Sequence, residues 1–365
     1  MKIKAAVFRD KSGKASIEAV ELEEPRDDEV LVRLVATGVC HTDIKVSTSE
    51  GMSPRPIVLG HEGAGVVERI GSRVAKVRPG DHVVMTYDAC GLCPSCLENH
   101  RTYCDEVGSR SFGGNRPDGT SPLSQDGRKI HGSFFGQSSF ADFALCYERN
   151  VVRVRKDAPL DLLGPLGCGV QTGAGAVVNA LKVGVGKSLA VFGTGSVGLS
   201  AIMAARLMGA GRVIAVDIQP ARLRAAQELG ATDTIDAKQQ DALQAIKTIS
   251  RRGVDFALDT TGLAPVIIQA VKGLAPLGVC GFIASPAEPV GIYIRDLMLG
   301  GRTLRGIVEG DSIPDLFIPA LIDFHLAGRF PLDRLVSYYP FERINDAIHD
   351  SESAAAIKPI LRMAG

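Results

Sequence analysis

The sequence predicts an α/β protein in which a doubly wound parallel sheet is inserted into a second, mainly β domain. In the first third of the chain, Val, Ile and Leu recur at about every second residue between turns of Gly, Pro and Asp, a pattern typical of antiparallel strands. From about Lys187 the pattern changes to strand, glycine turn and helix, repeated, which indicates βαβ units. After Gly301 this alternation ends in two helical stretches.

The elements follow in order along the chain. The first third contributes the strands AAVF, EVLVRLVATGV, GAGVVERIG and GDHVVMTY, and the Gly- and Ser-rich segment 104–139 is expected to be a long loop. The parallel sheet contributes SLAVFG, RVIAVD, VDFALD and VCGFIA, with helices at 196–208, 220–229, 241–250 and 264–273. Helices at 314–326 and 341–351 complete the chain. We therefore expect one discontinuous domain over 1–169 and 301–365, and a second over 170–300.

Composition excludes several classes of protein. Lys plus Arg and Asp plus Glu are equal at 41 each, so the basic surplus of a nucleic-acid or anionic-membrane binder is missing. The charged N-terminus, MKIKAAVFRD, lacks the apolar core of a secretory signal. The uncharged stretches 164–181 and 188–205 contain several glycines and predict buried strand–turn–helix segments rather than membrane spans. Four of the eight cysteines lie within fifteen residues, which favours metal ligands in a reducing cytoplasm over disulfides.

A glycine-rich turn points to a dinucleotide. Gly193, Gly195 and Gly198 form GxGxxG between a predicted strand and a predicted helix, where they allow a tight turn, approach to a pyrophosphate and close helix packing. Asp217 ends the next predicted strand, 22 residues after Gly195, where a carboxylate accepts hydrogen bonds from the ribose hydroxyls of an adenosine. That charge disfavours a 2′-phosphate, so this Rossmann-type pattern predicts NAD rather than NADP. The alternative is a tight turn with a capping aspartate.

The second signal is a lobe of four cysteines over residues 88–106. Cys90, Cys93 and Cys96 follow C-x₂-C-x₂-C spacing, and Cys104 follows after a gap of seven residues. Four thiolates can enclose Zn²⁺ with no open position, which is typical of a structural site. An iron–sulfur cluster is the rival, but its sequences usually place the fourth cysteine three residues on, before a proline. Four unliganded thiols are the remaining alternative.

A second metal site has a weaker basis in the sequence. Cys40 lies in GVCHTD, His61 in GHEGAGVV and Cys168 in GPLGCGV. Their spacing alone does not assemble them, and each by itself could be a core residue.

Five motifs in register change that assessment. GVCHTD, GHEGAGVV, CGLCPSC with its fourth cysteine, GPLGCGVQTG and GTGSVG together resemble the zinc-dependent medium-chain alcohol dehydrogenases over essentially the whole chain. GPLGCGVQTGAGAVVNALKV and FFGQSSFADFAL look most like the benzyl (aryl) alcohol dehydrogenases of bacteria. The resemblance implies a GroES-like catalytic domain, an inserted NAD-binding Rossmann domain, and two Zn²⁺ ions per subunit.

The resemblance also implies roles for individual residues. Cys40, His61 and Cys168 match the ligands of the catalytic zinc, and Asp43 matches the carboxylate that orients the histidine. Glu62 matches a carboxylate associated with ligand exchange at the metal, and Thr42 the hydroxyl that hydrogen-bonds the substrate oxygen. The positions that match cofactor contacts are His41, Thr172, Gly193, Gly195, Ser196, Val197, Gly198, Asp217, Arg222 and Lys358. Among these, Thr172 matches a residue beside the nicotinamide, and His41 and Lys358 match positions near the pyrophosphate.

One position departs from the family pattern. In many relatives the proton relay ends in a histidine three residues after the hydroxyl residue, where this chain has Lys45. Either Lys45 accepts the proton, or the relay ends at the ribose and solvent.

The implied activity is the reversible oxidation of a primary aryl or allylic alcohol, such as benzyl alcohol, to its aldehyde by a cytoplasmic homo-oligomer, dimer or tetramer. A general alcohol dehydrogenase and a glutathione-dependent formaldehyde dehydrogenase remain alternatives. A polyol dehydrogenase tends to carry glutamate in place of Cys168, and a catalytically silent relative of the fold would lack the ligand triad.

Overall fold

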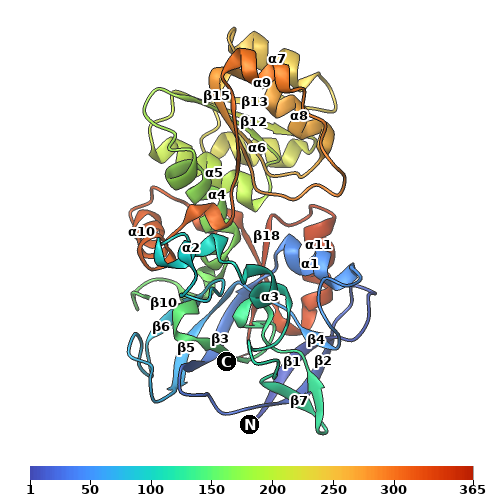
Figure 1. Ribbon diagram of the computed structural model, residues 1–365, viewed down its shortest axis with the longest axis vertical. Helices are drawn as coiled ribbons and strands as arrows, with labels where there is room; N and C mark the ends of the chain where they lie inside the picture. Colours follow the sequence, from blue (N-terminus) through green and yellow to red (C-terminus); the bar gives the residue numbers. More distant parts are fainter. Residues whose placement is uncertain (365) are drawn as a thin grey trace. The chain divides into compact units, whose positions relative to one another are not determined.

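Two units of the chain are distinguished by their internal contacts in the computed structural model, which describes residues 1–364 (Figure 1). The first unit comprises Met1–Cys168, Ile313–Leu326 and the residues from Leu332 on. The second comprises Gly169–Ser312 and Ala327–Pro331.

The first unit is built on two sheets. One has the strand order β4-β1-β2-β7-β8, with bounds β1 Lys2–Phe8, β2 Ser16–Leu22, β4 Ile57–Val58, β7 Leu123–Gln125 and β8 Arg128–Ile130. The other has the order β10-β6-β5-β3-β18-β17, with β9 also paired to β3. Its strands are β3 Glu29–Gly38, β5 Gly63–Ile70, β6 His82–Met85, β9 Phe143–Tyr147, β10 Val151–Val154, β17 Val336–Pro340 and β18 Lys358–Arg362. The expected mainly β domain is therefore present, with most strand pairs antiparallel.

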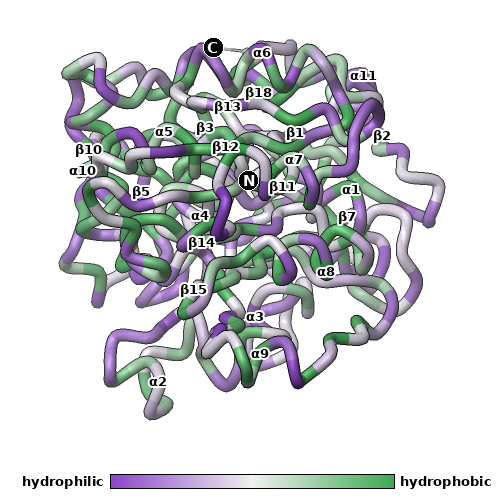
Figure 2. The backbone as a smooth tube through the Cα atoms, turned by 90° about the horizontal axis from the view of Figure 1, so that it is seen from above, coloured by the Kyte–Doolittle hydropathy of each residue, from purple (hydrophilic) through white to green (hydrophobic). Residues whose placement is uncertain are grey.

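The helices of this unit are short except for one. Their bounds are α1 His41–Thr48, α2 Pro94–Leu97, α3 Val107–Phe112, α10 Pro314–Leu326 and α11 Ile344–Glu352. Two apolar clusters form the core, one around Phe8, Phe134 and Phe140 and the other around β3, β5 and β6. Hydrophobic and hydrophilic residues are interleaved along the backbone (Figure 2), as expected when most strands bury only one face.

The segment expected to be a long loop is more structured than its composition predicts. Residues 104–139 contain α3, the hairpin of β7 and β8, and a 3-10 turn at Phe134–Gly136. Arg116 anchors the segment: its guanidinium is buried and donates to both carboxylate oxygens of Glu29, at 2.6 and 2.9 Å, and to Glu23 at 2.6 Å. These ion pairs join residues about ninety positions apart, so local composition does not reveal them.

The second unit is the predicted parallel sheet with its helices. The strands β11 Ser188–Phe192, β12 Arg212–Asp217, β13 Asp233–Asp236, β14 Val254–Asp259, β15 Leu274–Phe282 and β16 Thr303–Gly306 pair in the order β13-β12-β11-β14-β15-β16, all parallel. Its helices are α4 Gly169–Gly175, α5 Ser196–Leu207, α6 Pro220–Glu228, α7 Ala242–Ile249, α8 Ala264–Lys272 and α9 Ile294–Gly300. The helices α5 to α9 pack along these strands (Figure 1). This is the doubly wound arrangement.

Two details of the sequence prediction need correction. The sheet has six strands rather than the four predicted, because the short strands β13 and β16 also pair into it. The boundary near residue 300 is also wrong: β16 pairs with β15, so residues up to Ser312 belong to the second unit. No helix in the described part of the chain, residues 1–364, is long and apolar enough to cross a membrane.

Candidate metal and cofactor sites

The start of α1 holds the first candidate ligand. Cys40 precedes the helix in an extended conformation, and its backbone N–H donates to Asp43 Oδ2 at 3.0 Å, one half of a capping box. An acidic residue at the third helical position satisfies a backbone donor that the helix leaves unpaired. The local sequence Cys-His-Thr-Asp therefore determines that α1 begins directly after Cys40, and this places the Cys40 thiol at the start of the helix.

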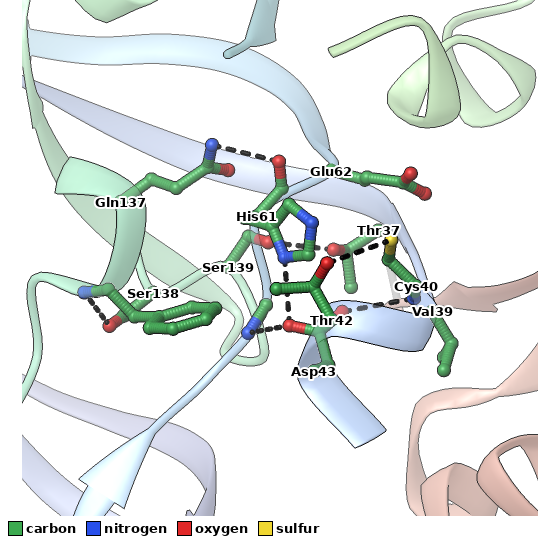
Figure 3. A network of polar contacts seen from close by, with 12 residues as sticks. Thr37, Val39, Cys40, Thr42, Asp43, His61, Glu62, Gln137, Ser138 and Ser139 are labelled. Atoms are coloured by element: carbon green, nitrogen blue, oxygen red, sulfur yellow. Dashed lines mark hydrogen bonds and ion pairs between the residues drawn. The ribbon is translucent and has the colours of Figure 1, made fainter. Parts of the chain in front are cut away.

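His61 is held by the same carboxylate (Figure 3). Asp43 Oδ1 lies 2.9 Å from His61 Nδ1 and accepts the Gly60 backbone N–H at 3.0 Å. Gly60 has φ +90°, and a Cβ there would lie 2.5 Å from the Phe140 backbone nitrogen, so only glycine fits. The other ring nitrogen, Nε2, is buried and has no hydrogen-bond partner within the chain. A buried imidazole nitrogen without a hydrogen-bond partner, on a ring whose other nitrogen is held by a carboxylate, is typical of a metal ligand.

The candidate ligands converge within the first unit. One ligand atom from each of Cys40, His61, Glu62 and Cys168 lies within 4.8 Å of every other. The Cys168 thiol, and to a lesser degree Lys358 and His61, hold the pKa of Cys40 well below its usual range against the effect of burial. Burial lowers the pKa of His61, but the charges of Asp43 and Cys40 outweigh it and leave that pKa well above its usual range. Two thiols and an imidazole are a donor set that suits Zn²⁺.

Glu62 and Lys358 form a buried ion pair at this group. Lys358 is 2% exposed, and its Nζ donates to Glu62 Oε1 at 3.0 Å, to Glu62 Oε2 at 2.9 Å and to the Val39 carbonyl at 3.1 Å. Burial raises the pKa of Glu62, although the Lys358 ammonium acts in the opposite direction. Burial by itself would lower the pKa of Lys358, but the Glu62 carboxylate outweighs it and raises that pKa. The three acceptors use the three N–H donors of Lys358, so its charge neutralises Glu62. The contact of Lys358 to a cofactor pyrophosphate that the family resemblance implies stays a prediction.

Gln137 was not found by sequence reasoning. It is buried, and its Nε2 donates to the His61 carbonyl at 3.0 Å (Figure 3). The same Nε2 donates to the Thr86 carbonyl at 3.1 Å, and Oε1 accepts the Gly63 N–H at 3.2 Å. It thus fixes the backbone on both sides of Glu62. A single glutamine in a Gly- and Ser-rich segment carries no sequence signal for this role.

Aromatic side chains surround the His61 ring. Phe135 stacks on it with ring centroids 4.5 Å apart and an interplanar angle of 25°, and Phe134 meets its edge at 5.7 Å. Phe112 packs edge-on against Phe135 at 5.3 Å. Phe135 has φ +51°, an unusual conformation for a bulky residue. Together with Asp43, this stacking fixes the plane of the imidazole.

The remaining predicted residues of this site lie on α1. The Thr42 hydroxyl is 3.9 Å from Cys40 Sγ. His41 and Lys45 are exposed on the same helix.

The four-cysteine lobe forms a second candidate metal site. The sulfur atoms of Cys90, Cys93, Cys96 and Cys104 all lie within 4.8 Å of one another. Backbone N–H groups point at them: those of Leu92 and Cys93 donate to Cys90 Sγ at 3.3 and 3.2 Å, and that of Cys90 donates to Cys104 Sγ at 3.2 Å. The Leu92 N–H in particular lowers the pKa of Cys90 to about 7. Among residues 1–364 no cysteine pair forms a disulfide. The lobe can therefore enclose a tetrahedral Zn²⁺.

In the second unit, the glycine turn has the geometry that its pattern predicts. Gly193 has φ +87°, and a Cβ on Gly198 would lie 1.9 Å from the Gly193 carbonyl oxygen. A Cβ on Gly195 would have nothing within 4 Å, so the backbone there is open to a ligand. Gly195 precedes α5, which begins with Ser196 and Val197 and has no side-chain cap, leaving its first N–H groups available to a phosphate.

Asp217 lies at the carboxyl end of β12, near this turn. Its Oδ2 accepts the Thr194 N–H at 2.6 Å and the Thr194 hydroxyl at 2.9 Å. Its Oδ1 accepts the N–H groups of Ile218 at 2.7 Å and Gln219 at 2.9 Å. The carboxylate therefore joins the glycine turn to the segment after β12. Arg222, on α6, has a buried Nε with no hydrogen-bond partner within the chain.

Comparison with known proteins agrees with this geometry. Family models match an alcohol dehydrogenase GroES-like domain over residues 26–156 and a zinc-binding dehydrogenase over residues 196–324. The chain is 46% identical over 361 residues to a geraniol dehydrogenase of Castellaniella defragrans, which covers 98% of this chain and 96% of that protein. The crystal structure of a benzyl alcohol dehydrogenase from Acinetobacter calcoaceticus matches with a TM-score of 0.96, 45% identity and full coverage of both chains. A zinc-binding dehydrogenase from Sinorhizobium meliloti bound to NADP is more distant, at a TM-score of 0.81, 25% identity and 99% coverage of both chains.

The identity to the geraniol dehydrogenase extends over nearly the full length of both proteins, and both units match the corresponding family models. The chain therefore belongs to the zinc-dependent medium-chain alcohol dehydrogenases.

Proposed function

We propose that the protein oxidises a primary aryl or allylic alcohol to the aldehyde, reversibly, with NAD as hydride acceptor and two zinc ions per chain. The observation that carries the proposal is the convergence of Cys40, His61 and Cys168, with His61 Nε2 unpaired and its Nδ1 held by Asp43. The substrate class is supported by the benzyl alcohol and geraniol dehydrogenases that this chain resembles at 45% and 46% identity.

The roles of the residues follow from their contacts. Cys40, His61 and Cys168 would hold one zinc ion, which supplies a Lewis acid that makes an alcohol oxygen more acidic. Asp43 keeps the proton of His61 on Nδ1, so Nε2 faces the ligand group. Thr42, beside Cys40, would hydrogen-bond the substrate hydroxyl and pass its proton outward, with Lys45 as the candidate acceptor on the exposed side of α1.

The second zinc ion would be structural. The cysteines of the lobe use all four coordination positions, so no position is left for a substrate. The lobe has only a small apolar cluster of its own, and a metal would supply the cross-links that it lacks.

The cofactor would bind to the second unit. The open backbone at Gly195 suits a pyrophosphate, and Asp217 suits a ribose diol and disfavours a 2′-phosphate. Arg222 and Thr172 complete the proposed cofactor contacts. NAD supplies the hydride acceptor, and the protein supplies position and exclusion of water.

We also infer a homo-oligomer in the cytoplasm. Two clusters of reduced thiols suit a reducing compartment. β16 lies at the edge of the parallel sheet, and the apolar side chains near it are between 64% and 80% exposed: Leu277, Tyr293, Ile294, Met298 and Leu299. Such a surface is typical of an interface. Light scattering on the wild type and on Met298→Asp tests this: a monomeric wild type would contradict it.

The deciding experiment measures zinc per chain by elemental analysis together with NAD reduction by benzyl alcohol, geraniol and S-hydroxymethylglutathione. We expect about two zinc ions and rapid reduction with the first two alcohols. Two zinc ions with turnover of the glutathione adduct alone would keep the family and overturn the substrate. Faster reduction of NADP than of NAD would overturn the assignment of the cofactor.

A further inference from the structure

Glu309 is a buried carboxylate of the second unit that the proposed reaction leaves unused. It is 8% exposed, and its Oε2 accepts hydrogen bonds from the Thr172 hydroxyl and from Gln171 Nε2, each at 3.2 Å. Burying a carboxylate is costly unless hydrogen bonds compensate it. Thr172 is the residue proposed to lie beside the nicotinamide, so Glu309 is one contact away from that ring.

The turn that carries Glu309 is held in an unusual conformation. Glu309, Gly310 and Asp311 have φ values of 50°, 65° and 50°, all in the left-handed region. Two of these residues are not glycine, and such conformations persist where surrounding contacts over-determine them, commonly at ligand sites.

Those surrounding contacts come from α4 and the turn of helix that follows it. A Cβ on Gly310 would lie 2.5 Å from the Gln171 carbonyl oxygen, so the turn approaches α4 as closely as glycine allows. Asn179 Nδ2 donates to the Gly310 carbonyl at 3.2 Å. Arg305 donates to the Ala180 carbonyl at 2.8 Å and pairs with Asp311. These contacts hold the backbone of the turn that carries Glu309 against α4.

The place of Glu309 in the sheet indicates which half of the cofactor it serves. A dinucleotide lies across the carboxyl ends of the strands in a sheet of order 3-2-1-4-5-6, with one mononucleotide on each half. Asp217 ends β12, in the half proposed for adenosine, and Glu309 follows β16 by three residues, in the other half. The nicotinamide end of the cofactor would therefore bind over the half of the sheet that contains β16.

We propose that Glu309 is a positioning residue of the nicotinamide subsite, whose carboxylate holds the Thr172 hydroxyl and the Gln171 amide in the orientation that receives the nicotinamide. This inference rests on the proposed use of NAD. It adds a residue that acts on the cofactor through Thr172, without a contact of its own to the reacting atoms.

The test compares two ligands that differ only by the nicotinamide. Binding of NADH and of ADP-ribose is measured by calorimetry for the wild type, Glu309→Ala and Glu309→Gln. We expect Glu309→Ala to weaken NADH binding about tenfold, the loss for an unsupported buried hydrogen-bond partner, and to leave ADP-ribose within about twofold. Glu309→Gln keeps an amide oxygen for both donors and recovers most of the NADH affinity.

Matched variants separate positioning from a structural role. Asp311→Asn changes the other carboxylate of the same turn, which pairs with Arg305, and is expected to leave the NADH affinity unchanged. Thr172→Val removes the hydroxyl that donates to Glu309, and is expected to weaken NADH binding as much as Glu309→Ala while leaving ADP-ribose binding unchanged. This variant keeps the inference testable if Glu309→Ala fails to fold. In the double variant of Thr172→Val with Glu309→Ala, the two losses of NADH affinity are expected not to add, because both changes remove the same hydrogen bond.

Three outcomes would overturn the inference: equal weakening of NADH and ADP-ribose, the same NADH loss in Asp311→Asn, or unchanged NADH binding in Thr172→Val. A wild type that binds neither ligand would instead overturn the proposed use of NAD, so the two failures are distinguishable.

Discussion

Replacing Asp43 by asparagine tests the candidate catalytic metal site most directly. Three donors converge on the two carboxylate oxygens of Asp43: Cys40 N–H on Oδ2, and Gly60 N–H and His61 Nδ1 on Oδ1. Asparagine has one oxygen, so whichever way its amide is turned, an NH₂ group faces at least one of these donors. The variant changes few atoms, but it removes a charge and an acceptor from a buried site.

The magnitude follows from these contacts. An unsatisfied buried N–H costs about 1–3 kcal/mol, and the imidazole also loses a charge-assisted hydrogen bond. Loss of the partner that orients a metal-ligating histidine typically lowers metal affinity about ten- to a hundredfold, which is about 1.4–2.7 kcal/mol. The two ranges agree, so we expect zinc affinity at this site to fall by that factor.

The assay follows zinc release into excess chelator with a metallochromic dye. The wild type is expected to release two zinc ions slowly, whereas Asp43→Asn releases one of them at least about tenfold faster and the other at the wild-type rate. Asp142→Asn is the matched control, because Asp142 also accepts a backbone N–H, that of Lys4 at 3.0 Å, in the same unit. Identical release rates in the wild type and both variants would refute the reasoning. Loss of both ions together would show that Asp43→Asn has unfolded.

Three further predictions concern the cofactor, the proton relay and the cysteine lobe. Asp217→Ser removes an acceptor that holds the glycine turn and is proposed for the ribose, so NADH affinity measured by fluorescence is expected to fall about tenfold or more; unchanged affinity would contradict the assignment. If Lys45 accepts the relayed proton, Lys45→Ala lowers turnover at moderate pH with the zinc content unchanged, and an unaltered pH–rate profile would remove it from the relay. In zinc-depleted protein, Cys90, with its pKa lowered to about 7, is expected to be alkylated increasingly as the pH rises through 7, well before Cys280, whose burial raises its pKa. Mass spectrometry locates the label, and equal labelling of both thiols would contradict this.

The features that the sequence predicted well are local ones. The glycine turn and the cysteine lobe each lie within one short segment, so their spacing along the chain largely determines their spacing in space. The four predicted parallel strands are also a local signal, since a strand that is buried on both faces is a short run of apolar residues. The two strands that were missed, β13 and β16, have only four residues each and carry charged or polar side chains.

The candidate catalytic site was predicted only through the resemblance to a family. Cys40 and Cys168 are separated by 128 positions along the chain, and nothing in the residues between them indicates that their sulfur atoms meet. The side chains that hold these residues in place were harder still to predict. The burial of Lys358 against Glu62 and the bridge made by Gln137 each depend on contacts between segments at least 51 residues apart.

The sequence by itself therefore determined the fold class, the glycine turn before α5 and the composition of the cysteine lobe, because each follows from periodicity or spacing over neighbouring residues. Only the tertiary structure decided what the isolated polar residues do. Lys358 neutralises Glu62, which no spacing along the chain indicates, and Glu309 lies against Thr172 although no motif singles it out. The physical reason is burial: a charged side chain removed from water must find a partner, and the fold supplies that partner from a distant part of the chain.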